Sequence, residues 1–218
     1  MSPSTDDADT VDPRAVARVR ILDAAAVAFM RQGFRSTTID DIAADLGATK
    51  GLIYYHFRSK FDLFLAVYEE GMRRVRDRVQ PHTEGSEDGR ERLVAMSVAH
   101  LHNLMSDLAY HHVVHQGVRA KDSVELKIRQ RDALDALNEH RRGYEQLFRD
   151  VVADGIADGS LRAVDPSLAA RTLLSSLNGV DLWFRNVEGQ SDAELADLAT
   201  QVVGLLIGGL EARGGRHG

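Results

Sequence analysis

Hydrophobic residues recur at intervals of three and four along almost the whole chain, which is the spacing of one face of an α-helix. No stretch alternates hydrophobic and polar residues in the way a half-buried strand does. We therefore predict an all-α fold. The expected helices, about nine in all, lie near 14–32, 38–46, 49–56, 60–79, 89–108, 110–120, 123–158, 166–187 and 192–212.

Two of these helices are short and separated by a tight turn. Thr38 is suited to cap the first helix, and Gly47 stands where the chain must turn sharply. The second helix runs from Thr49 to about His56. Two helices of about two turns joined at a glycine predict a helix-turn-helix, whose second helix enters the major groove of DNA.

The residues of this stretch also carry a resemblance. TTIDDIA followed by ATKGLIYYHFRSKFDLF resembles the DNA-binding domain of the TetR/AcrR family of one-component transcriptional regulators. The polar composition of residues 1–13 predicts a disordered tail, and the apolar stripe of 60–79 predicts a connecting helix. The resemblance implies a three-helix DNA-binding domain at 14–60 and a ligand-binding and dimerisation domain at 80–218. It further implies a homodimeric repressor that binds a palindromic operator in double-stranded DNA and is released by a small hydrophobic or acyl-CoA-like molecule, with activation as the alternative.

The DNA contacts are expected on the second short helix and around it. Thr49, Lys50 and Gly51 stand at its leading end, where base edges are reached. Phosphate contacts, which need only a donor, are expected from Thr38, Tyr54, Tyr55, His56 and Lys60. The alternative for the two tyrosines, and for Tyr55 in particular, is a side chain that is partly buried in the core. Leu52 could either contact a thymine methyl group or pack inward.

The distribution of charge supports this assignment. The net charge is −6, which is unusual for a DNA-binding protein. Residues 1–13 carry −4, residues 14–80 carry +4 and residues 81–218 carry −6. The segment with the helix-turn-helix is therefore the only basic one, and screening limits the influence of the acidic remainder to about 10 Å.

Composition excludes several other classes of protein. The chain is 44% hydrophobic and 28% charged and has no cysteine. We do not expect the acidic, polar start MSPSTDDADT to act as a signal peptide, and no apolar run has the length of a membrane span. We expect a cytoplasmic protein. Because Walker, GxSxG and dinucleotide-binding motifs are missing too, we expect neither an enzyme nor a cofactor.

The last two predicted helices are apolar around much of their circumference. Gly204 and Gly208 are four residues apart and so lie on one helix face, where they permit a close approach of another backbone. We interpret the pair as a two-fold dimer interface, with a buried helix pair inside one chain as the alternative. The expected interface residues are Leu173, Leu177, Val202, Gly204, Leu205 and Gly208.

The effector is not identified by the sequence. Hydrophobic residues expected to face inward are candidates for its pocket, although core packing is the simpler interpretation of each: Leu101, Met105, Leu108, Leu147, Val151, Leu177 and Trp183. The family that the chain resembles includes regulators that sense coenzyme A thioesters. Basic residues that would face such an anion, or merely lie on the surface, are Arg119, Lys121, Arg141, Arg142 and Arg185.

Histidines are concentrated between His100 and His115, with His102, His111 and His112 between them. His111 and His115 are four residues apart and can chelate a metal ion on one helix face. A metal-responsive regulator is therefore one alternative, and a helical protein-interaction module is another. Because no cysteine accompanies the histidines, we expect pocket-lining or solvated side chains and no metal site.

Overall fold

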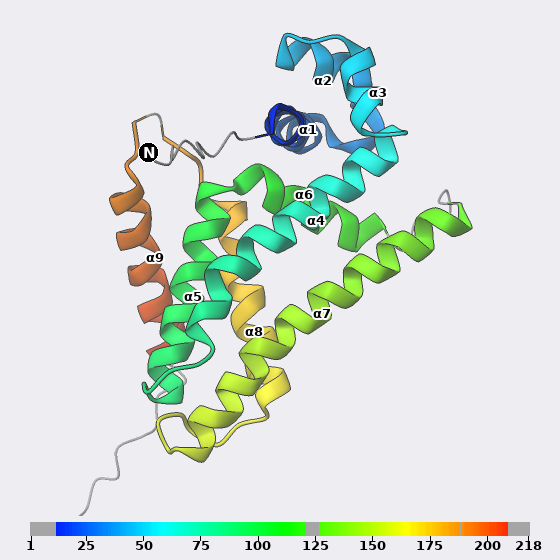
Figure 1. Cartoon of the computed structure of the whole chain (residues 1–218). Helices are drawn as coiled ribbons and strands as arrows, with labels where there is room; N and C mark the ends of the chain where they lie inside the picture. Colours follow the sequence, from blue (N-terminus) through cyan, green and yellow to red (C-terminus); the bar gives the residue numbers. More distant parts are fainter. Residues whose placement is uncertain (1–11, 121–126, 188, 209–218) are drawn as a thin grey trace, which may run out of the picture. The chain divides into compact units, whose positions relative to one another are not determined.

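The computed structural model describes residues 12–120, 127–187 and 189–208. Within these ranges the chain forms nine α-helices and two short 3-10 helices, and no strand (Figure 1). The all-α prediction is therefore confirmed. The chain divides into two compact units that meet between Val67 and Tyr68.

The first unit contains α1 (Pro13–Ser36), α2 (Ile39–Leu46), α3 (Lys50–His56) and the first turns of α4 (Lys60–Val79). Its core is formed by one buried side of each helix, with Phe29, Ile42 and Ile53 fully buried. The Phe34 ring packs at 4.9 Å from that of Phe64 and 5.8 Å from that of Phe29, measured between centroids. These contacts hold the start of α4 against the end of α1.

The second unit contains the rest of α4, η1 (Gln80–His82), α5 (Gly89–Ser106), α6 (Leu108–Ala120), α7 (Ile128–Ala157), α8 (Pro166–Asn178), η2 (Gly179–Leu182) and α9 (Asp192–Ile207). Helix α5 is central and contacts α6, α7, α8 and α9 (Figure 1). At the start of α5, a Cβ on Gly89 would lie 2.3 Å from the backbone of Gly155 on α7. Glycine is required there because the two backbones touch.

The predicted end of the first helix at Gly33 agrees with the backbone there, because the φ of 76° and ψ of 160° of Gly33 are not helical; a short turn beyond this kink completes α1. A later predicted helix differs from the observed one. The helix predicted at 166–187 ends at Asn178 and gives way to η2, so Trp183 lies beyond it with 57% of its surface exposed. Of the predicted tail, residues 1–11 lie outside the described residues.

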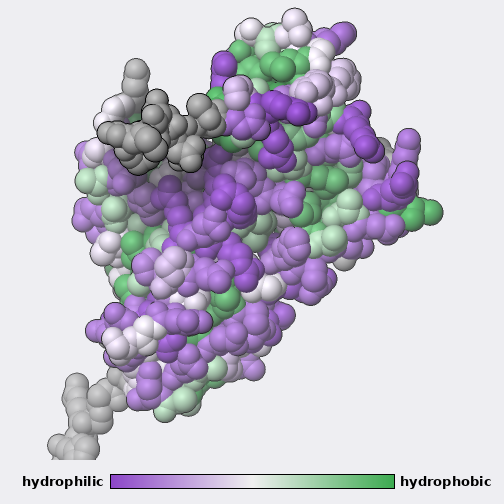
Figure 2. Space-filling model, in the orientation of Figure 1, coloured by the Kyte–Doolittle hydropathy of each residue, from purple (hydrophilic) through white to green (hydrophobic). Residues whose placement is uncertain are grey.

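The face drawn in Figure 2 is mainly hydrophilic, and its hydrophobic patches are separated by polar side chains. Among the described helices, none combines the length and the apolar character that crossing a membrane requires.

Candidate functional site

The helix-turn-helix is held by local hydrogen bonds that its sequence specifies. Thr38 Oγ1 accepts from the Asp41 backbone N–H at 3.1 Å, and the Thr38 N–H donates to the Asp41 carboxylate at 2.8 Å, forming a capping box. The Thr38 hydroxyl also donates to the Asp41 carboxylate at 2.7 Å, and this bond, together with that from the Thr38 N–H, lowers the pKa of Asp41 below its ordinary value. Gly47 then adopts the left-handed conformation (φ 66°, ψ 32°), and its N–H donates to the Ala44 carbonyl at 3.0 Å. The turn thus directs the chain into α3.

Helix α3 exposes the side that was expected to meet DNA. Ile53 is fully buried, whereas Tyr54 and Tyr55 expose 52% and 63% of their surface, so neither tyrosine belongs to the core. Thr49 occupies the N-cap position but makes no capping hydrogen bond with its side chain. The Lys50 ammonium is exposed and lies 3.4 Å from the Asp40 carboxylate, a contact that contributes little at the surface. Polar groups at the leading end of α3 are therefore available to a ligand.

Lys60 differs from the expectation of a phosphate contact. Its ammonium donates to the backbone carbonyls of Phe34 at 2.7 Å, Arg35 at 3.1 Å and Thr37 at 2.7 Å, and it lies 4.6 Å from the centroid of the Phe34 ring. An ammonium has three protons, and each is placed on a carbonyl. Burial lowers the pKa of Lys60. The geometry assigns Lys60 to holding the C-terminal turn of α1 against α4.

The second unit contains a cavity of about 910 Å³. Met72 and Val75 of α4, Val114 and Val118 of α6, and Leu174 of α8 supply apolar surface. The polar and remaining residues that line it are Gly71, His100, Asn103, Tyr110, His111, His115, Glu139, Arg141, Arg142, Gly143, Tyr144, Glu145, Gln146, Arg149, Arg171, Ser175 and Asn178. A space of this size holds a drug-sized or larger organic ligand.

None of the seven predicted pocket residues lines this cavity. Four of them are packed in the core with almost no exposed surface: Leu101, Met105, Val151 and Leu177. Trp183 lies beyond the end of α8 and is exposed, and Leu108 and Leu147 are only partly buried. Hydrophobic side chains chosen from the sequence are mostly those that fill the core. A cavity remains where polar groups and short side chains interrupt the packing.

Buried polar residues were the signal that sequence reasoning missed. The His100 ring is hydrogen-bonded to the Tyr144 hydroxyl at 2.7 Å through Nδ1 and to the Asn178 amide oxygen at 3.0 Å through Nε2. Burial lowers the pKa of His100 to about 4 and raises that of Tyr144 well above its ordinary value. These neutral groups give one wall of the cavity fixed hydrogen-bonding geometry. Polar residues on otherwise apolar helix faces were visible in the sequence.

Arginines form another part of the lining. Arg149 and Arg171 share the Glu145 carboxylate, at 3.2 Å and 2.9 Å. In the described part of the chain, the Nε atoms of Arg141 and Arg149 are buried and have no hydrogen-bond partner. Of the basic residues suggested by sequence, Arg141 and Arg142 thus reach the cavity. Arg185 does not line it, because its guanidinium donates to the carbonyls of its own turn; the Arg119 side chain and Lys121 lie outside the described residues.

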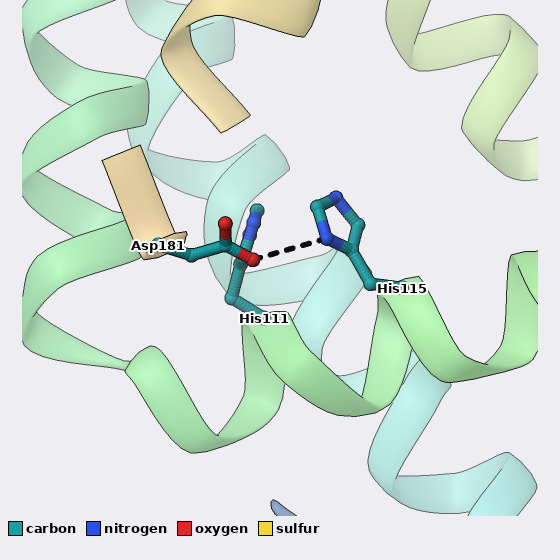
Figure 3. A group of neighbouring side chains, drawn as sticks. All are labelled: His111, His115 and Asp181. Atoms are coloured by element: carbon teal, nitrogen blue, oxygen red, sulfur yellow. Dashed lines mark ion pairs between the residues drawn. The ribbon is translucent and has the colours of Figure 1, made fainter. Parts of the chain in front are cut away.

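The histidines separate into two groups. His111 and His115 on α6 converge with Asp181 of η2, as Figure 3 shows, and the His115 Nδ1 lies 3.2 Å from the Asp181 carboxylate. His102 lies elsewhere, 2.9 Å from the carboxylate of Asp192 on α9. His111 has a pKa well below its ordinary value because it is buried and its histidine neighbours repel a second charge.

The predicted dimer residues also divide. Leu177 is fully buried within the chain and Leu173 nearly so, and both are part of the intrachain packing. Leu205 exposes 84% of its surface, and a Cβ added to Gly204 or Gly208 would meet nothing within 4 Å. The glycines therefore serve no close helix contact among the described residues.

Two family models match the chain. One, described as bacterial regulatory proteins of the tetR family, covers residues 21–67, and the other, a tetracyclin repressor-like C-terminal domain, covers residues 86–210. The chain belongs to the TetR family. It is a family of DNA-binding transcriptional regulators with a ligand-binding domain, which confirms the prediction that the chain is not an enzyme.

One curated relative and two solved structures match over nearly their whole length. The HTH-type transcriptional repressor KstR2 of Mycolicibacterium smegmatis is 26% identical over 211 residues, which cover 96% of this chain and 98% of that protein. AibR, in a crystal structure with isovaleryl coenzyme A and operator DNA, gives a TM-score of 0.66 at 22% identity, covering 87% of this chain and 97% of that one. Bacillus subtilis FadR with stearoyl-CoA gives 0.63 at 21%, covering 88% and 99%.

Proposed function

We propose that the chain is a homodimeric repressor that binds a palindromic operator and releases it when an acyl-coenzyme A-like effector enters the cavity of the second unit. The observation that carries the proposal is the lining of that cavity, which joins apolar surface from α4 and α6 to guanidinium groups from α7 and α8. An acyl-coenzyme A thioester has two matching parts, an apolar acyl chain and the polyanionic coenzyme A group.

DNA binding is assigned to the exposed side of α3 and its cap. Thr49, Lys50 and Gly51 are placed against base edges, with Lys50 donating to guanine O6 or N7. Phosphates are contacted by the remaining donors: Thr38, Tyr54, Tyr55 and His56. The exposure of Tyr54, Tyr55 and Lys50 supports this assignment.

Anionic ligand groups fit the arginine side of the cavity. Buried guanidinium N–H groups without an acceptor, as at Arg141 Nε and Arg149 Nε, carry a desolvation cost that a phosphate or carboxylate oxygen offsets. Among the structural neighbours, AibR and FadR are named as complexes with isovaleryl coenzyme A and stearoyl-CoA. This chemistry supports a coenzyme A thioester as the effector class.

The connection between the two functions is assigned to α4. It is one continuous helix whose first turns bury Phe61 and Phe64 in the first unit and whose later turns supply Gly71, Met72 and Val75 to the cavity. An effector that favours one orientation of the later turns shifts the population of dimers toward a conformation in which the distance between the two α3 helices no longer matches the spacing of the operator half-sites.

The dimer is assigned to the outward side of α8 and α9. Leu168 of α8 and Leu205 of α9 are exposed, a Cβ at Gly204 or Gly208 of α9 would meet nothing within 4 Å, and Val202 is partly buried. Large exposed apolar side chains on these two helices favour burial against a second copy.

The test has a DNA arm and an effector arm. Operator duplexes are selected from a random library, and binding is followed by fluorescence anisotropy for the wild type, Lys50→Ala and the control Arg31→Ala, whose guanidinium is paired with Asp45 at 3.4 Å. We expect Lys50→Ala to lose affinity by at least about tenfold and to relax base preference at one position, with the control unchanged. Failure of the wild type to select any duplex contradicts the proposal.

The effector arm measures release of the operator by isovaleryl-CoA, stearoyl-CoA and free coenzyme A. We expect an acyl-CoA to release it and Arg141→Gln to weaken that response at least about tenfold. Arg131→Gln, an exposed residue of α7 outside the cavity, is the control. Release by none of the three compounds contradicts the effector class and leaves DNA binding standing.

A further inference from the structure

Three side chains beside the cavity form a group that the proposed function does not use. His111 and His115 lie one turn apart on α6, with ring centroids 4.3 Å apart, and Asp181 reaches them from η2 (Figure 3). One ligating atom from each residue can be chosen so that all three lie within 4.8 Å of one another. Asp181 is buried, and both histidines line the cavity.

An ordinary ion pair explains only part of this group. The contact of 3.2 Å between His115 Nδ1 and Asp181 gives the buried carboxylate a partner. This ion pair does not involve His111, whose Nε2 atom is buried and has no hydrogen-bond partner in the described part of the chain. Buried ring nitrogens are almost always satisfied, so an unpartnered one beside a second imidazole and a carboxylate indicates a missing ligand.

We propose that His111, His115 and Asp181 bind a divalent first-row transition-metal ion such as Zn²⁺ or Co²⁺ at the wall of the cavity. Two imidazole nitrogens and one carboxylate oxygen suit these ions, whereas Mg²⁺ and Ca²⁺ prefer oxygen ligands alone. Metal–ligand distances of about 2.0–2.2 Å require ligating atoms about 3.5 Å apart, which changes in side-chain torsion supply.

A third histidine lies close to this group. His100 lies beside His111, with centroids 6.4 Å apart, but both of its nitrogens are occupied by Tyr144 and Asn178. His100 therefore packs beside His111 and is not a fourth ligand.

Three protein ligands leave the metal with open coordination positions. Because His111 and His115 line the cavity, an open position faces its interior, where water or an oxygen atom of a bound molecule completes the shell. The site adds a metal to the wall of the effector cavity and does not depend on which effector binds there.

The experiment measures metal binding without DNA or effector. Protein prepared without a histidine tag and treated with EDTA is titrated with ZnCl₂ by calorimetry and with CoCl₂ by visible absorption. The variants are His111→Ala and Asp181→Asn, with His112→Ala as the control on the same helix. We expect about one ion per chain, a loss of at least tenfold in affinity for both variants, and a change below twofold for the control.

Folding of each variant is checked by far-UV circular dichroism. If His111→Ala fails to fold, the isosteric Asp181→Asn and the Co²⁺ spectrum of the wild type, which reports nitrogen and oxygen ligands, decide the question. Absence of Zn²⁺ and Co²⁺ binding by the wild type overturns the proposal, as does equal affinity of the wild type and the folded variants. Operator binding by metal-free protein then remains intact, which separates this failure from failure of the proposed function.

Discussion

Lys60 provides a stringent test of how this structure should be interpreted, because sequence and structure give it different roles. As a phosphate contact, its ammonium acts only when DNA is bound. In the structure the ammonium donates to the carbonyls of Phe34, Arg35 and Thr37, which project from the end of α1 after the bend at Gly33. Lys60→Met keeps most of the aliphatic stem and removes all three donors.

The expected loss is one of stability. A hydrogen bond from a charged group contributes about 1.5–3 kcal/mol, but three bonds from one partly exposed ammonium are not additive, so we expect Lys60→Met to lower the free energy of unfolding by about 2–4 kcal/mol. For a chain of this size that lowers Tm by about 5–10 °C. Urea unfolding followed by far-UV circular dichroism measures the change, with exposed Lys50→Ala as the matched control, expected within about 0.5 kcal/mol of the wild type.

A second readout distinguishes the two roles. Loss of a phosphate contact reduces the slope of log affinity against log salt concentration by about 0.9. We expect folded Lys60→Met to keep the slope of the wild type. An unchanged stability together with a reduced slope refutes our interpretation and restores the phosphate contact.

Two further predictions concern the second unit. Leu205→Glu should convert the proposed dimer to a monomer in sedimentation equilibrium without loss of helix content, whereas Val187→Glu, at a residue 67% exposed against 84% for Leu205 and outside α8 and α9, should remain dimeric; a dimer in both cases removes α9 from the interface. Because the pKa of buried His100 is about 4 against an ordinary 6.5, the unfolded chain binds a proton that the folded chain does not, and stability falls as the pH drops from about 6.5 to 4, by up to about 3 kcal/mol. In His100→Gln this part of the pH dependence should be missing; an identical dependence in urea unfolding at pH 7, 6, 5 and 4 contradicts it.

Local features of the sequence were sufficient for most of the fold. The three-to-four spacing of hydrophobic residues predicted helices because a helix can bury only one side of itself. Thr38 and Gly47 marked the helix-turn-helix because a capping hydroxyl and a left-handed backbone are requirements of the nearest few residues. The end of α8 at Asn178 was missed, since the apolar residues beyond it continue the same spacing.

The cavity and its chemistry were decided by tertiary structure alone. Leu101 and Val151 are hydrophobic, as pocket residues often are, but they are buried in the core. Arg149, by contrast, lines the cavity. Asp181 joins His111 and His115 only because η2 folds back onto α6, a contact between residues about seventy positions apart. The spacing of hydrophobic residues indicates which side of each helix is buried. It does not state which helices meet, where their packing leaves space, or which polar groups line that space, because these depend on the joint arrangement of all the helices.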